Sequence, residues 1–112
     1  MKNIKSSSKV FLSEIKEFKY NYSVDYTNQF KKDTLAILKS GLDLELMRTV
    51  IRILATDGKL PDEYKPHRLK GNFKDYWECH IKGNWLLVWL QSDASLTLML
   101  TNTGTHQDIF DM

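Results

Sequence analysis

The chain has 112 residues, of which 42% are hydrophobic and 27% charged, and its formal net charge is +2. A chain of this length commonly forms one domain, and the composition excludes a disordered or low-complexity protein. The single cysteine, Cys79, excludes an internal disulfide and is typical of a reducing compartment. Because no stretch resembles a signal peptide or a membrane span, we expect a soluble, cytoplasmic protein with no membrane partner. The small net charge does not by itself indicate nucleic-acid binding.

The first part of the chain predicts an extension at residues 1–19, followed by a single domain at residues 20–112. Within the extension, four apolar side chains have the spacing of a short amphipathic helix: Phe11, Leu12, Ile15 and Phe18. Residues 20–27 (YNYSVDYT) alternate and are rich in aromatic and β-branched side chains, which predicts a strand.

Two helices are predicted next, at residues 28–41 and 42–58. The second has the clearest amphipathic pattern in the chain. Gly41 and Gly58 stand where helices of this kind end, because glycine adopts the left-handed conformation of a helix C-terminus. The short connection between the two helices favours an antiparallel helical hairpin.

The pattern then changes to the period of two that is typical of strands. In YWECHI (76–81), one face carries Trp77, Cys79 and Ile81, and the other carries Tyr76, Glu78 and His80. A tight turn at residues 83–84 leads into WLLVWL (85–90), which is apolar on both faces like a central strand, and a last strand is predicted at 95–103. The sequence therefore predicts an α+β fold in the order β-α-α-β-β-β, with the helices on one face of a largely antiparallel sheet.

The three histidines come from separate segments of this sheet region. If the 76–81 face with Cys79 points to the helices, His80 points away from the core. His67 lies in the basic lead-in KPHRLKG, and His106 directly follows the last strand. All three can therefore converge on the open face of the sheet.

Three interpretations of these histidines remain open. Exposed histidines are commonly no more than surface polar groups. A zinc site is disfavoured, because no short-spaced ligand pair such as H-x-H or HExxH is present and Cys79 faces the core. The third interpretation is acid–base chemistry on an RNA phosphodiester, since histidine titrates near neutrality and can serve as acid or base.

Cations and aromatic rings that such chemistry needs surround the upstream histidines. Positive side chains could absorb charge on the phosphate: Lys65, Arg68, Lys70, Lys74 and Lys82. Trp85 and Phe110 could stack on unpaired bases. For each lysine alone, a solvated surface charge is favoured over a functional role, and for Trp85 core packing is an equally good interpretation.

The run EYKPHRLKGNFKDYWECHIKGNWLLVW…TNTGTHQDIF resembles the YafQ branch of the RelE/ParE superfamily of bacterial toxins. The resemblance covers about residues 20–110. It rests on three pieces in order and at the family's spacing: YK-x-H-x-L-x-G-x-(F/W)-K, the CHI…W hairpin and the terminal TGTH-x-x-(I/L)F.

The resemblance implies a small curved antiparallel sheet with an N-terminal helical hairpin. It also implies a ribosome-dependent, metal-independent endoribonuclease that cuts mRNA in the ribosomal A site. His67, His80 and His106 match the family's functional histidines, with His106 as general acid, and Trp85 and Phe110 match its functional aromatics. The implied partner is a DinJ/RelB-like antitoxin, through which alone the toxin would be linked to operator DNA.

Two positions depart from the family pattern. Asn84 stands where the family usually has Asp, and Asn102 stands where it tends to have Arg. Asparagine at residue 84 cannot act as a base, and losing a charge-stabilising arginine can lower a rate by on the order of a hundredfold. These departures leave open a second reading, a weakened toxin that acts mainly as its antitoxin's partner in autoregulation. A ParE-like gyrase inhibitor is a third, disfavoured by the three histidines.

Overall fold

The computed structural model describes residues 3–18 and 20–110. The first part of the chain holds three helices and one strand, in the order α1 (Ile4–Lys16), β1 (Ser23–Tyr26), α2 (Asn28–Lys39) and α3 (Leu44–Asp57). The rest is strand-rich, with β2 (His67–Arg68), β3 (Trp77–Lys82), β4 (Trp85–Ser92), β5 (Thr97–Gly104) and the short helix α4 (His106–Phe110). Two 3-10 turns, η1 (Asp62–Tyr64) and η2 (Gly71–Phe73), flank β2. No helix in the described ranges is long and apolar enough to cross a membrane.

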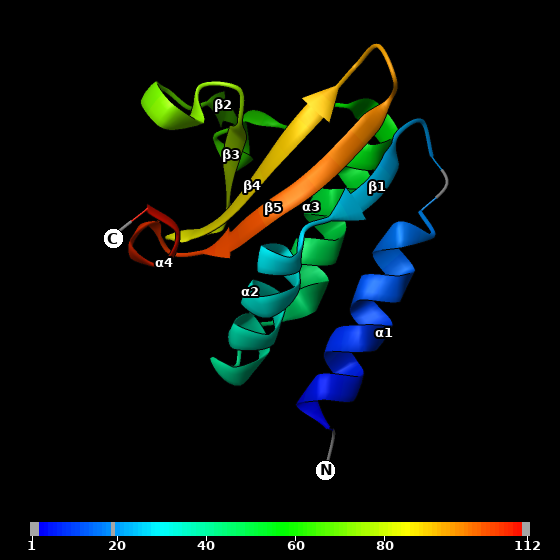
Figure 1. The fold of residues 1–112 in the computed structure, drawn as a ribbon, viewed down its shortest axis with the longest axis vertical. Coiled ribbons are helices and arrows are strands. Elements are labelled where there is room, and N and C mark those ends of the chain that lie inside the picture. The colour runs from blue at the N-terminus through cyan, green and yellow to red at the C-terminus, as the bar shows by residue number, and fades with distance from the viewer. Residues whose placement is uncertain (1–2, 19, 111–112) are drawn as a thin grey trace.

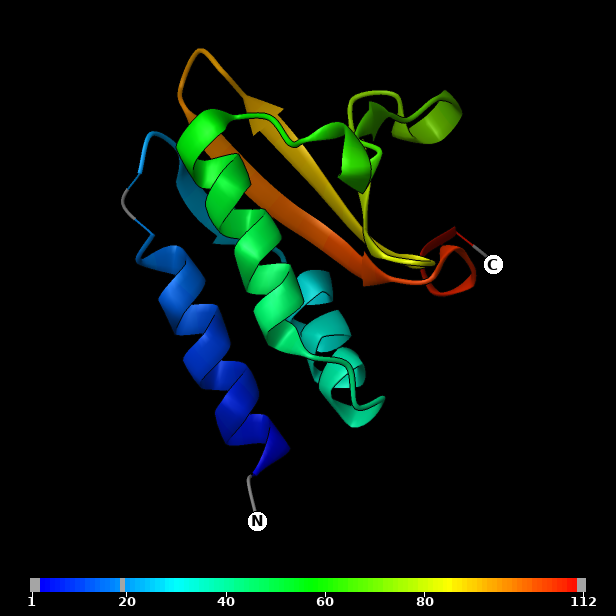
Figure 2. The same cartoon turned by 180° about the vertical axis from the view of Figure 1, so that it is seen from behind.

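The five strands form one mixed sheet in the order β1-β5-β4-β3-β2. β1 pairs with β5 in parallel, and the other three pairings are antiparallel. Figures 1 and 2 show α1, α2 and α3 beside this sheet, with α3 across its rear face. The predicted α+β class, with helices on one side of the sheet, is confirmed; the parallel edge strand makes the sheet mixed.

Local sequence signals account for the helix boundaries. The side chains of Asn3, Thr27 and Asp43 accept hydrogen bonds from backbone N–H groups in the first turns of α1, α2 and α3. Such caps satisfy N–H groups that a helix leaves without partners. The predicted helices at 28–41 and 42–58 are therefore confirmed; α2 ends earlier than predicted, and α3 is shorter at both ends.

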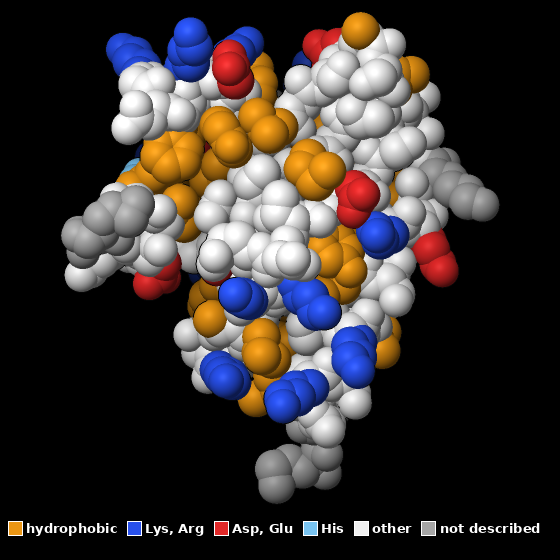
Figure 3. Space-filling view, viewed as in Figure 1, with side chains coloured by type: hydrophobic (Ala, Val, Ile, Leu, Met, Phe, Trp, Pro, Cys, Tyr) orange, Lys and Arg blue, Asp and Glu red, His pale blue; other side chains and the backbone are white. Residues whose placement is uncertain are grey.

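Helix α1 lies within the predicted extension and packs into the same core as the rest of the chain. Phe11, Leu12 and Ile15 are buried against it, so the amphipathic spacing seen in the sequence is used. Contacts of α1 run to α2, α3 and β1. On the face shown in Figure 3, Lys and Arg side chains gather over α1 and α2.

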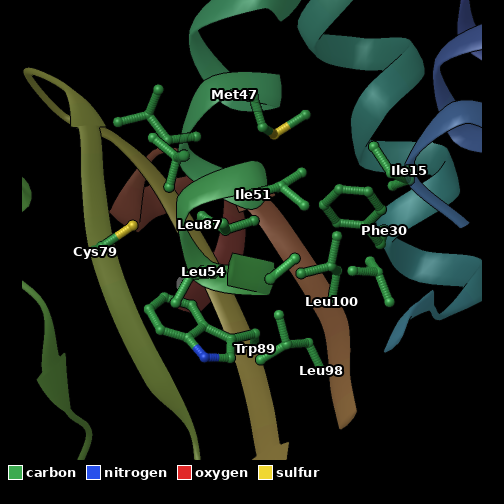
Figure 4. Packing of buried hydrophobic residues seen from close by; sticks show 14 of the residues in the cluster. Ile15, Phe30, Met47, Ile51, Leu54, Cys79, Leu87, Trp89, Leu98 and Leu100 are labelled. Atoms are coloured by element: carbon green, nitrogen blue, oxygen red, sulfur yellow. The ribbon is translucent and has the colours of Figure 1, made fainter. Parts of the chain in front are cut away.

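The core lies between the helices and one face of the sheet (Figure 4). Alternate residues of β4 face the helices: Trp85, Leu87 and Trp89. The residues between them, Leu86 and Val88, are buried on the opposite face of the sheet. Cys79 belongs to the helix side, and burial raises the pKa of its thiol to about 12. The prediction that β4 is apolar on both faces because it is central is confirmed.

Gly58 ends α3 in a left-handed conformation, with φ +69°. A Cβ placed there would lie 2.5 Å from the Tyr22 hydroxyl, which donates to Asp93. We expect Gly58→Ala to lower the free energy of unfolding by about 1–2 kcal/mol for the left-handed backbone and about 1–3 kcal/mol more for the displaced ring. Urea unfolding of the purified protein measures this loss.

Gly41→Ala is the matched control, because Gly41 has φ +80° and nothing within 4 Å of an added Cβ. It is expected to show only the backbone part of the loss. Equal losses in the two variants would show that the Tyr22 contact contributes nothing.

Candidate active site

The open face of the sheet carries a row of paired residues from four strands. His67 pairs with Glu78, Glu78 with Val88, and Val88 with Asn102. The neighbouring row pairs His80 with Leu86, and Leu86 with Gly104. Side chains of directly paired residues share a face, so His67, Glu78 and Asn102 lie on the side of the sheet away from the helices.

Glu78 is the centre of this face. Its side chain is only 2% exposed, although acidic side chains are rarely so deeply buried unless they are paired. Its Oε1 lies 3.3 Å from His67 Nε2 and 3.4 Å from His106 Nε2. Its Oε2 is buried without a hydrogen-bond partner in the described ranges. A buried carboxylate is costly unless it is paired, so two histidines converging on one oxygen define a polar centre in an otherwise apolar sheet.

The sequence placed Glu78 on the correct face and gave it no role. The sequence predicted that Glu78 shares the open face of the sheet with His80. In the structure, neighbouring segments cover that part of the face and bury the Glu78 carboxylate. The available signal was a single acidic residue inside an apolar strand, two positions before a histidine. A charged residue is rarely fully buried without a partner, and the partners come from β2 and α4, elements that the sequence did not predict.

His67 is held between two acceptors. Its Nδ1 lies 2.9 Å from the Lys65 carbonyl oxygen, and its Nε2 faces Glu78. An imidazolium donates from both ring nitrogens, so this arrangement can hold a positive ring whose side chain is still 48% exposed. Lys65 itself has a left-handed backbone, with φ 50°, which turns the chain into β2.

His80 and His106 meet edge to face, with ring centroids 6.3 Å apart. His80 Nδ1 lies 2.8 Å from the Gly83 carbonyl oxygen. When the Nδ1–H donates to that carbonyl, the neutral ring has its lone pair on Nε2, which is the form that accepts a proton. The side chain of His106 is 60% exposed, so this ring can reach a bound substrate.

A two-way cap starts α4 and places His106. Thr105 N–H donates to Asp108 Oδ2 at 2.9 Å, and Asp108 N–H donates to Thr105 Oγ1 at 3.1 Å. This is the capping box that T-x-x-D can form, a signal present in THQD. The predicted exit of the last strand is thus a short helix whose first residue is the histidine.

A cavity of about 340 Å³ opens beside Glu78, and its lining combines acid–base, cationic and aromatic side chains: His67, Leu69, Lys70, Phe73, Glu78, His106 and Phe110. The aromatic wall is continuous, because the Phe110 ring lies 5.0 Å from Phe73 and 5.8 Å from His106, centroid to centroid. The sequence analysis did not single out Phe73.

Other predicted site residues lie elsewhere. Trp85 is buried on the helix side, where its Nε1–H donates to Thr103 Oγ1 at 2.9 Å, so its ring has the core position that the sequence left open. The Arg68 guanidinium stacks over the Trp77 ring at 5.6 Å and lies 3.8 Å from Asp75. Lys74 is exposed at the end of η2.

Asn84 is exposed in the β3–β4 turn and lines a separate cavity of about 410 Å³ on the α2 side. Lys82, Gly104 and Asp108 also line that cavity. Within residues 3–18 and 20–110, no three His, Cys, Asp or Glu side chains are arranged to hold a metal ion.

Comparison with known proteins agrees with the fold. Residues 22–111 match the family described as the bacterial toxin of type II toxin–antitoxin system, YafQ. The mRNA interferase toxin YafQ of Escherichia coli K12 is 30% identical over 88 residues, covering 78% of this chain and 94% of the relative.

Solved structures give the same result. The E. coli DinJ–YafQ complex superposes with a TM-score of 0.72 at 29% identity, covering 80% of this chain and 98% of the matched one. A metal-bound toxin from Helicobacter pylori superposes with a TM-score of 0.73 at 38% identity, covering 80% and 99%. These matches define the class as toxins of type II toxin–antitoxin systems. Within that class, the chain belongs to the YafQ family.

Proposed function

We propose that this toxin is a ribosome-dependent endoribonuclease that cuts mRNA in the A site by histidine acid–base chemistry. The observation that carries the proposal is the meeting of His67 and His106 on the buried carboxylate of Glu78, with His80 against the His106 ring, beside a cavity with a cation and aromatic rings. The relatives named mRNA interferase toxin YafQ support the same activity.

Cleavage of an RNA phosphodiester needs a base for the 2′-OH and an acid for the leaving 5′-oxygen. We assign His106 as the acid, because its side chain is more exposed than that of His67, the other histidine that faces Glu78. His80, with Nε2 free to accept, is placed as base, and His67 as a cation on the phosphate. Lys70 adds charge stabilisation and Phe110 offers a stacking surface for a base. Since every proposed step uses a protein group, the reaction is proposed to be metal-independent.

Lys65 and Lys74, exposed near β2 and η2, are proposed to steer RNA toward the cavity. A DinJ-like antitoxin is the proposed inhibitory partner, as the E. coli DinJ–YafQ complex suggests by analogy. Its link to operator DNA is proposed to be indirect, through that antitoxin. The protein would act in the cytoplasm, where its ribosomal target is found.

Primer-extension mapping of a reporter mRNA in a bacterial translation lysate tests the proposal. We expect codon-phased cuts that require ribosomes and persist when transition metals are removed by a chelator that leaves the ribosomal Mg²⁺ in place. Cuts in naked RNA without ribosomes would contradict the ribosome dependence. An absence of cuts by folded protein would favour the second reading, a weakened toxin that acts mainly as antitoxin partner.

Asn102 is the specific observation that favours this second reading. It lies on the open face, two strands from Glu78 in the same row, without the positive charge that the resemblance leads us to expect. We expect Asn102→Arg to raise the cleavage rate by up to about a hundredfold, because a guanidinium there would stabilise phosphate charge. Single-turnover cleavage on ribosomes measures the gain.

Ser95→Arg is the matched control, since it adds the same charge in the exposed β4–β5 turn, away from the site. An equal gain from both variants would mean that the effect is general attraction to RNA. No gain from Asn102→Arg would show that Asn102 does not limit the rate.

A further inference from the structure

The lysines of α1 and α2 form a second charged surface that the proposed catalytic site does not use. Lys5, Lys9 and Lys16 are spaced by four and seven residues, which places them on one face of α1. Lys32 and Lys39, seven apart, follow one face of α2. Lys31 stands beside them, and all six lysines are exposed.

The acids of these two helices turn away from this surface. Glu14 Oε2 lies 3.2 Å from Arg48 Nε of α3. Asp33 accepts from the Thr103 N–H of β5 at 3.0 Å, and burial raises the pKa of Asp33. Six lysines therefore face solvent while the two carboxylates on the same helices serve internal contacts.

Only one of the six amines has a carboxylate partner in the described ranges, Lys16 at 3.4 Å from Asp25. We call the other five the helical basic face: Lys5, Lys9, Lys31, Lys32 and Lys39. α1 packs directly on α2, and Figure 3 shows Lys and Arg side chains over both helices on one face of the molecule. Like charges held together without counter-charges repel one another, and a bound polyanion relieves that repulsion.

Figure 3 shows where this surface lies relative to the proposed site. Lys and Arg side chains gather over α1 and α2, and a second group lies at the end of the molecule that carries β2 and η2. Both groups are visible on the same face. A single large, phosphate-rich surface can therefore contact both, whereas a short mRNA strand seated in the cavity beside Glu78 reaches only the second group.

We infer that the helical basic face docks on the phosphate backbone of ribosomal RNA, and that α1 is an addition to the family domain that enlarges this contact. The family match covers residues 22–111, so α1 lies outside it. The inference rests on the proposed ribosome dependence, because the docked RNA is the one that surrounds the A site.

The test uses the full-length protein and vacant bacterial ribosomes, with binding followed by co-sedimentation over a range of salt. Each lysine that neutralises a phosphate contributes about 0.7–0.9 to the slope of log affinity against log salt. We expect Lys5→Gln/Lys9→Gln to reduce the slope by about 1.5, and the fourfold variant with Lys31→Gln and Lys32→Gln to reduce it by about 3.

Arg52→Gln/Lys59→Gln is the matched control. It removes two exposed positive charges from α3 and the turn that follows it, and Figure 2 shows α3 on the side of the sheet that is turned away in Figure 1. It is expected to leave the slope unchanged. Equal slope changes in the control and the α1 pair would overturn the inference, because they would reflect net charge alone.

Cleavage measured in the same variants separates this inference from the proposed function. Ribosome binding that depends on the lysines, by a protein that never cuts mRNA, would uphold the inference and refute the nuclease. Ribosome-dependent cutting with an unchanged salt slope would uphold the nuclease and overturn the inference. Loss of antitoxin binding without loss of ribosome binding would assign the face to an acidic protein, and loss only on a free oligoribonucleotide would assign it to mRNA; either result overturns the inference.

Discussion

His106→Ala is expected to abolish growth arrest and to slow mRNA cleavage by about 10²–10⁴-fold, the usual contribution of a general acid. The ring is 60% exposed and stands at the start of α4, so its loss removes little packing. Folding and antitoxin binding should therefore be retained. Induced expression in a bacterial host measures toxicity, and primer extension on purified ribosomes measures cleavage.

Gln107→Ala is the control, because residue 107 is also exposed in the first turn of α4. It should remain toxic. If His106→Ala were as toxic as the parent protein, the acid assignment would be wrong and His67 or His80 would have to supply the proton.

Glu78→Gln is expected to slow cleavage by about tenfold to a hundredfold while leaving the protein folded. Glutamine keeps the shape of the side chain and removes the charge that faces His67 and His106 at 3.3 and 3.4 Å. Losing that charge weakens the two contacts that orient these rings. Removing a buried carboxylate also removes its desolvation cost. The free energy of unfolding should therefore change little, although the cleavage rate falls.

Glu63→Gln, a change at an exposed carboxylate on η1, is the matched control and should leave the cleavage rate unchanged. An equal loss of rate in the two variants would show that the effect comes from net charge alone. An unchanged rate in Glu78→Gln would show that the carboxylate does not position the histidines.

The sequence alone predicted most of the fold, because periodicity is a local property. The amphipathic stripe of α3, the alternation of β3, the turn at residues 83–84 and the two-sided apolar strand β4 were all predicted and are present. The parallel pairing of β1 with β5 was not predicted, since strand partners more than 70 residues apart leave no trace in either strand's own pattern.

The histidines were predicted to share the open face, and the alternation of β3 was enough to place His80 there. The motif order carried the resemblance to YafQ toxins, which the family match confirms. The catalytic roles of the three histidines stay predictions, as do the roles of Lys65, Lys70 and Phe110.

Only the tertiary structure brought Glu78, His67 and His106 together. His67 is nearer to Glu78 along the chain than His106 is. The contact of His67 with Glu78 depends on the pairing of β2 with β3, and the contact of His106 depends on α4 folding back over the end of β5. The sequence determined which residue types were available and which face of a strand each occupied. The packing of β2 and α4 decided which of them were close enough to share a proton, because a carboxylate becomes a partner only where neighbouring segments exclude water from it.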